Sequence, residues 1–126
     1  MAAARRPEGN ANTAAEAVRK YNHATLPTPR SRTGVLHYPG QAYSSIAAFK
    51  QMAQMLPQAF GQTSAALTRL HHDGHLTADH GTVEDHVFDA RQALTEAAHC
   101  ADMLADALNR AHSAVAPLGY SGPIDE

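Results

Sequence analysis

The sequence predicts an all-α fold built on one long antiparallel helical hairpin, residues about 42–72 and 82–115, with a short N-terminal helix. Alanine, the strongest helix former, occurs 26 times among the 126 residues, and there is no tryptophan. Two long segments repeat apolar residues at alternating steps of four and three, the spacing of helices that pack along one seam. An Asp-Gly pair between the two segments favours a chain reversal.

A short helix is expected first, over about residues 13–24. Thr13 and Glu16 have the spacing of a capping box, in which each side chain accepts a hydrogen bond from a free backbone N–H at the start of a helix. Residues 26–34 then contain two prolines and no apolar periodicity, which predicts an extended linker. The tripeptide at 38–40, Tyr-Pro-Gly, predicts a tight turn because proline fixes φ and glycine tolerates a positive φ.

The first long helix is expected after this turn. Pro57 interrupts its pattern away from the seam, which predicts a kink near residues 53–57. Asp73-Gly74 predicts the end of the helix, since glycine readily closes a helix in the left-handed conformation. The predicted seam consists of Ala42, Ile46, Phe49, Ala53, Leu56, Phe60, Thr63, Leu67 and Leu70, with Thr63 its only polar member.

The second long helix carries the more regular seam. Thr82 is the expected N-terminal cap, followed by the acidic Glu84 and Asp85 in the first turn, where the helix dipole favours negative charge. Pro117 predicts the end of this helix. Its seam consists of Val83, Val87, Ala90, Leu94, Ala97, Ala101, Leu104, Leu108, Ala111 and Val115.

The charge distribution suggests three parts: an N-terminal arm (1–40), a hairpin core (41–116) and a C-terminal tail (117–126). Residues 1–40 carry six basic and two acidic side chains, whereas residues 41–126 carry four basic and ten acidic ones. The arm is therefore basic, and we expect it to be partly flexible outside its short helix. The core and tail together are acidic.

The first long helix is unusually poor in charge, because Lys50 is the only charged residue between Gln41 and Thr68. A helix with a fully solvated face rarely lacks charge to this extent, so we expect another surface to cover it. Self-association, with two hairpins forming a four-helix bundle, is the preferred prediction, and a cover formed by the N-terminal arm and residues 118–124 is the second. A third possibility is binding to a different protein. The predicted interface residues are Ile46, Phe49, Met52, Ala53, Met55, Leu56, Ala59 and Phe60.

The main alternative function is nucleic-acid binding through the basic arm. Arginine and lysine side chains bind phosphates, and a dimeric core would supply two-fold symmetry. The acidic core opposes this alternative, because it would repel a polyanion. The candidate residues are Arg5, Arg6, Arg19, Lys20, Arg30 and Arg32.

Catalysis and cofactor binding are not predicted. The segment between the two long helices holds His71, His75 and His80, which are weak metal-ligand candidates because their spacing matches no zinc motif. Cys100 is the only cysteine, so no internal disulfide can form. No apolar stretch reaches the 18 residues or more of a membrane span, and the first 20 residues lack a signal-peptide core. The expected protein is therefore cytoplasmic and acts by binding.

Overall fold

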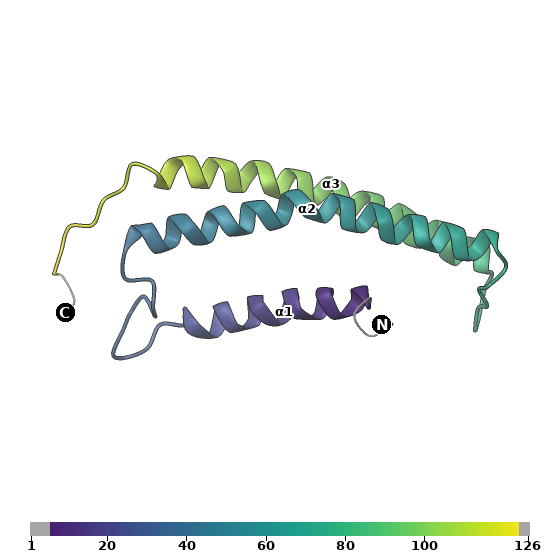
Figure 1. The fold of residues 1–126 in the computed structure, drawn as a ribbon, viewed down its shortest axis with the longest axis horizontal. Coiled ribbons are helices and arrows are strands. Elements are labelled where there is room, and N and C mark those ends of the chain that lie inside the picture. Colours follow the sequence, from purple (N-terminus) through teal and green to yellow (C-terminus); the bar gives the residue numbers. More distant parts are fainter. Residues whose placement is uncertain (1–5, 124–126) are drawn as a thin grey trace. The chain divides into compact units, whose positions relative to one another are not determined.

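The computed structural model describes residues 6–123, which form three helices and no strand: α1 (Pro7–Ala24), α2 (Pro39–His72) and α3 (Val83–Val115). The predicted all-α class is therefore confirmed for these residues (Figure 1). They divide into two compact units. One comprises residues 6–41 with 120–123, and the other comprises Ala42–Gly119.

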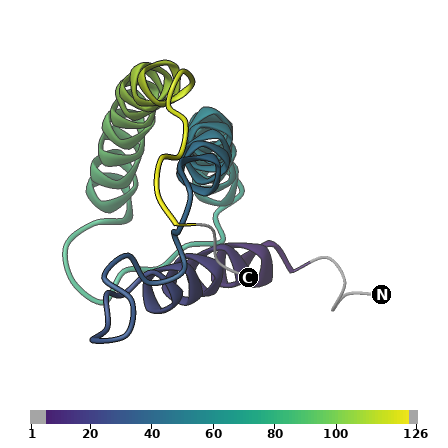
Figure 2. The same ribbon diagram turned by 90° about the vertical axis from the view of Figure 1, so that its left-hand side faces the viewer.

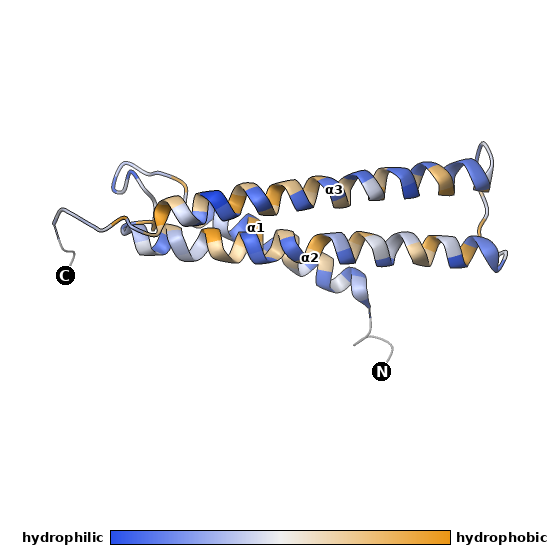
Figure 3. Cartoon of the chain, turned by 90° about the horizontal axis from the view of Figure 1, so that it is seen from above, coloured by the Kyte–Doolittle hydropathy of each residue, from blue (hydrophilic) through white to orange (hydrophobic). Residues whose placement is uncertain are grey.

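The unit Ala42–Gly119 is a helical hairpin, as predicted. Its helices α2 and α3 run side by side in opposite directions (Figures 1 and 2). Their observed bounds, 39–72 and 83–115, lie close to the expected 42–72 and 82–115. Apolar residues recur along both helices, so each can face the other with a hydrophobic seam (Figure 3).

Gly74 ends α2 in the predicted way. Its φ is +73°, in the left-handed region that favours glycine. The N–H of Gly74 donates to the carbonyl of His71, and the N–H of His75 donates to that of Leu70, both at 3.0 Å. These two bonds form a Schellman motif, which satisfies carbonyls at the end of the helix and starts the chain reversal.

Thr82 caps α3, which confirms a second local prediction. Its hydroxyl oxygen accepts a hydrogen bond from the N–H of Asp85 at 3.1 Å. Glu84 and Asp85 both lie in the first turn, where the helix dipole favours their charge. The start of the second long helix is thus set by its own first residues.

The predicted start of α1 was wrong, because the helix begins at Pro7 and not near Thr13. Proline suits the first helical position, where its missing N–H is not needed and its fixed φ is already helical. Glu8 follows it in the first turn, where an acid is favourable. Thr13 lies inside the helix, and its hydroxyl donates to the carbonyl of Gly9 at 2.9 Å instead of capping an N-terminus.

The turn predicted at residues 38–40 was also wrong, since Pro39 is the first residue of α2 and Gly40 has no positive φ. The side chain of Gln41 explains the difference. Its Oε1 accepts hydrogen bonds from the N–H groups of His37 at 2.7 Å and Tyr38 at 3.0 Å. A glutamine in the first turn that bonds back to the preceding backbone stabilises the start of a helix.

The segment between α1 and α2 is folded into turns and is not the extended linker predicted. The backbones of Thr28 and Ser31 bond to each other at 2.6 Å and 3.1 Å. Gly34 has a φ of +62°, and a side chain there would lie 2.7 Å from the backbone of Thr25. The chain therefore returns to the end of α1 at a position where only glycine fits.

Pro57 lies inside α2 without ending it, because the helix continues from Pro39 to His72. The ribbon of α2 changes direction near its middle (Figure 1), where a proline removes one helical hydrogen bond. Pro57 is partly buried, although the sequence placed it off the seam. The contact face of α2 is therefore rotated with respect to the predicted seam.

The hairpin has few fully buried side chains. Among the described residues, the buried apolar side chains are Ala53 (1% exposed), Ala101 (5%) and Val87 (9%), all three on the predicted seams. Most other seam residues are partly buried, but Leu104 and Leu70 are 49% and 40% exposed. Two helices alone cannot enclose a core of large side chains, so small residues mark where they approach most closely.

Candidate interaction surface

The two helices contact each other through their seams and through one flank of each seam, which we call the covered flank. It consists of partly buried residues: Tyr43, Lys50, Pro57, Ser64 and His71 on α2, and Ala98, Ala105 and His112 on α3. Tyr43 stacks on His112 with ring centroids 4.1 Å apart, and Lys50 Nζ donates to Asn109 Oδ1 at 3.2 Å. These contacts join the first third of α2 to the last third of α3, so they also fix the register of the hairpin.

The other edge of both seams is exposed, including the seam residues Thr63, Leu70 and Leu104, and we call this edge with the exposed residues beside it the open flank. It consists of Ala59, Thr63, Ala66 and Leu70 on α2, and Ala93, Cys100, Leu104, Ala107 and Ala114 on α3. None of these side chains is charged, and Thr63 is the only hydroxyl among them. Met55 and Met103, both 59% exposed, border this surface. The hairpin therefore carries a long uncharged face that its own two helices do not cover.

Charge is distributed unequally between the two helices. α2 contains two basic residues, Lys50 and Arg69, and no acidic one. α3 contains six acidic residues and two basic ones, which gives it a net charge of −4. A surface that faces α3 is therefore favoured when it is neutral or basic, and α2 has that character.

The residues predicted for the interface occupy different positions on α2. Ile46, Phe49, Met52, Leu56 and Phe60 are partly buried, and Ala53 is buried. Ala53 is thus part of the seam and is not accessible to a second chain. Ala59 and Met55 are exposed and lie on or beside the open flank. The heptad pattern does not show which flank the hairpin leaves open, because α3 has apolar residues on both.

Of the basic residues predicted to bind nucleic acid, Arg5 lies outside the described residues. Arg6, Lys20, Arg30 and Arg32 are exposed. Arg19 is exposed but engaged, since its guanidinium donates to both carboxylate oxygens of Glu16 at 2.8 Å and 3.0 Å. These bonds raise the pKa of Arg19 above its ordinary value, because they stabilise the charged guanidinium.

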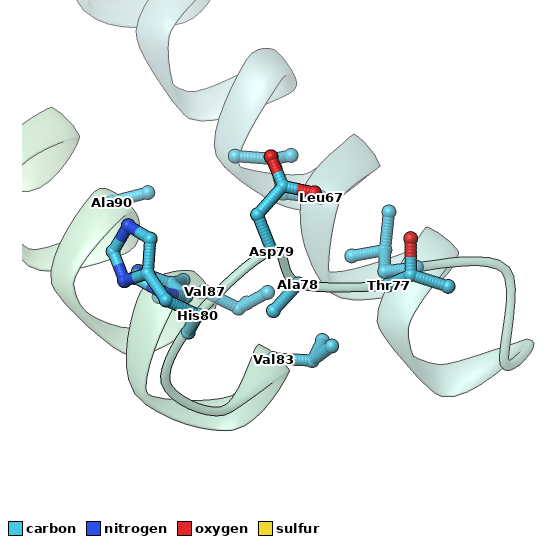
Figure 4. Close-up of a pocket in the computed structure, with 10 residues that line it drawn as sticks. Leu67, Thr77, Ala78, Asp79, His80, Val83, Val87 and Ala90 are labelled. Carbon is cyan, nitrogen blue, oxygen red and sulfur yellow. The ribbon is translucent and has the colours of Figure 1, made fainter.

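The loop between the hairpin helices is held by a histidine. The Nε2 of His86 is 2.7 Å from the carbonyl oxygen of His80, and the two rings meet edge to face with centroids 5.1 Å apart. Sequence reasoning missed this role of His86, which depends on a contact across the loop. An open pocket of about 410 Å³ lies beside it, and Figure 4 shows Asp79 and His80 of the loop near Leu67 of α2 and Val87 of α3.

The weak metal-ligand candidates are not assembled into a site. His71 is partly buried at the end of α2, while His75 and His80 are exposed in the loop. Within residues 6–123, no group of three or more histidine, cysteine or acidic side chains is arranged to hold a metal ion. The pocket beside the loop is lined mainly by apolar side chains, and its polar lining residues are Thr77, Asp79, His80 and His86.

None of the three described helices combines the length and the apolar character needed to cross a lipid bilayer. The chain matches no protein-family model, no curated protein and no solved structure.

Proposed function

We propose that this protein is a non-catalytic interaction module, a scaffold or adaptor, that self-associates through its helical hairpin. Two hairpins joined by their open flanks would form a four-helix bundle, in which each helix packs against two neighbours. The observation that carries the proposal is the long uncharged surface that remains exposed on both α2 and α3.

The composition of this surface supports an interface more than a solvated face. Leu104 and Leu70 on the open flank, and Met55 and Met103 at its border, are between 40% and 59% exposed. Burial of such side chains in an interface stabilises the complex by about 25 cal/mol for each Å² of apolar surface removed from water. The alanines between them leave room for a second backbone to approach, as small residues do at close helix contacts.

A pair of alanine substitutions on α2 tests the proposal. Ala59→Glu places a carboxylate on the open flank, whereas Ala65→Glu places the same group on an exposed face away from the seam. Both changes have the same effect on helix propensity, so they differ only in position. Burying an unpaired carboxylate in an interface costs several kcal/mol, so we expect Ala59→Glu to dissociate the dimer and Ala65→Glu to leave it intact.

Light scattering over a dilution series of the full chain provides the measurement. A dimer of the wild-type chain at low micromolar concentration, lost in Ala59→Glu alone, is the expected result. A monomer at every concentration contradicts self-association and favours a cover formed by the arm and tail, or a different protein partner. A dimer that both variants retain contradicts the open flank as its interface.

Nucleic-acid binding by the arm is the rival proposal, and the structure gives it less support. Glu16 engages Arg19, and within α1 the basic Arg19 and Lys20 are balanced by Glu8 and Glu16. This rival predicts binding to a DNA duplex that weakens steeply with salt and disappears when the basic residues are replaced. The hairpin proposal predicts a dimer in which the same replacements leave the native mass unchanged.

A further inference from the structure

The outer edge of the open flank carries a row of exposed residues on each helix, spaced seven apart. On α2 the row is Ala48, Met55, Gln62 and Arg69, and on α3 it is Asp89, Glu96, Met103 and Arg110. Residues seven apart drift by only about 20° around a helix, so each row stays on one face over its whole length. We call these two sets the outer rows.

The hairpin register places the outer rows level with each other. The bond from Lys50 to Asn109 defines one level at which α2 and α3 meet. Met55 lies five residues beyond Lys50, and Met103 lies six residues before Asn109. At a rise of about 1.5 Å per residue, Met55 and Met103 are therefore at nearly the same height along the hairpin.

The other level pairs are found by moving seven residues at a time from the two methionines. Because the helices are antiparallel, a step forward along α2 corresponds to a step backward along α3. Gln62 is level with Glu96, and Arg69 is level with Asp89. In the other direction, Ala48 is level with Arg110. The rows therefore match a basic residue with an acidic one, a methionine with a methionine, and an amide with a carboxylate, and no pair combines like charges.

We propose that a second copy of this chain docks on the open flank about a two-fold axis parallel to the helices. This inference rests on the proposed self-association and adds its geometry. Rotation about such an axis keeps every residue at its own height, so α2 packs against the partner's α3 in the register already present in the hairpin. Arg69 then faces the partner's Asp89, and Met55 meets the partner's Met103, each pair occurring twice.

The charges of the helices favour this axis over a two-fold axis perpendicular to them. The perpendicular axis sets α3, with its net charge of −4, directly against the same helix of the partner. If this axis crosses the middle of the outer rows, it also pairs Asp89 with the partner's Arg110, but it places Glu96 against the apolar Met103 of the partner. With the parallel axis, each acidic α3 lies beside an α2 that carries two basic residues and no acid.

Charge exchange distinguishes the two axes. Arg69→Asp brings two acids together in the parallel arrangement, and Asp89→Arg brings two bases together. Each single variant should raise the dimer dissociation constant about 2- to 30-fold, and the double variant R69D/D89R should restore it. The perpendicular arrangement places Arg69 beside the partner's Ala48, so Arg69→Asp should then have little effect and the double variant should not recover.

Disulfide formation gives an independent readout that does not rely on affinity. One chain carries Met55→Cys and a second carries Met103→Cys, both with Cys100→Ser, and the two are mixed under mild oxidation. A covalent dimer containing one chain of each kind is expected, because a disulfide needs Cα atoms within about 7 Å. In the wild-type chain, Cys100 should not cross-link, since the parallel axis places the two cysteines diagonally across the bundle.

The outcomes separate the geometry from the self-association on which it rests. Rescue by the double variant together with the Met55–Met103 cross-link supports the parallel axis. A wild-type dimer cross-linked through Cys100 overturns the parallel axis and leaves self-association intact. The same conclusion follows if light scattering finds a dimer that shows neither the Met55–Met103 cross-link nor recovery in the double variant. A monomer by light scattering overturns both the proposed function and this inference.

Discussion

Ala53 offers the most direct test of how closely the two helices approach. It is 1% exposed, the least accessible apolar side chain among the described residues, and it lies in the middle of the α2 seam. We consider Ala53→Leu, which adds three carbon atoms at this position. If the seam had room for them, their burial would stabilise the hairpin by about 0.8 kcal/mol per carbon. The sign of the effect therefore reports whether space exists.

We expect Ala53→Leu to destabilise the hairpin. Extra methylene groups in a closely packed site force side chains off their rotamers or move the backbone, which costs about 1–3 kcal/mol. For a unit of this size, each kcal/mol lowers the melting temperature by about 4–8 °C. Thermal unfolding followed by circular dichroism, at one fixed protein concentration, measures this change. Ala65→Leu is the matched control, because Ala65 is exposed on the same helix and should show almost no shift.

A rise in melting temperature for Ala53→Leu relative to Ala65→Leu would refute the reasoning. It would mean that the seam at Ala53 is loosely packed and that the helices are not held together at this point by the small side chain. Equal shifts in the two variants would have the same meaning, since only burial distinguishes the two positions.

Three further predictions concern the local motifs. Thr82→Ala should lower the free energy of unfolding by about 1 kcal/mol in chemical denaturation, because it removes the hydroxyl that accepts from the N–H of Asp85. Gly74→Ala should cost about 1–2 kcal/mol in the same assay, through the left-handed backbone alone, since nothing lies within 4 Å of an added methyl group. Gly34→Ala should disrupt the turn after α1 more severely, because its methyl group would also meet the backbone of Thr25 at 2.7 Å, and faster amide hydrogen exchange near Thr25 would reveal it. An unchanged exchange pattern in Gly34→Ala, or equal stability of the other two variants and the wild-type chain, would contradict these motif assignments.

The features that could be predicted from sequence are those decided by a few neighbouring residues. Gly74 ends α2 and Thr82 begins α3 because their conformational and hydrogen-bonding properties act within one helical turn. The two long helices follow from seams that repeat over about thirty residues, so no single deviation hides them. Their antiparallel pairing then follows from the chain reversal that Gly74 starts.

The failures have an equally local cause, which is competition between signals. Thr13 has the spacing of a capping residue, but Pro7 is a stronger start because it suits the first turn without any partner. Pro39 also suits the first turn of a helix, and the side chain of Gln41 stabilises this start by accepting hydrogen bonds from the preceding backbone. A sequence typical of a turn therefore becomes the start of a helix. A short motif shows what a residue can do, and the neighbouring chain decides which option is used.

The flank left open could not be predicted, because the apolar stripe of α3 is wider than its seam. Both flanks of that helix contain several alanines, and the pattern alone allows either to face α2. The choice depends on contacts between residues far apart in the sequence, namely Tyr43 with His112 and Lys50 with Asn109. Once these contacts are made, the hairpin turns toward one flank and exposes the other.

Exposed alanine by itself does not define an interface, since alanine is the strongest helix former and costs little on a solvated face. Docking is favoured instead by the exposed Leu70, Leu104 and methionines, and by the absence of charge between them. Helix propensity explains an alanine equally well on every face of a helix. An interface makes substitution costly only on the face that it covers. Because Ala59→Glu and Ala65→Glu change propensity by the same amount, any difference between them in native mass must come from a surface that contacts the open flank.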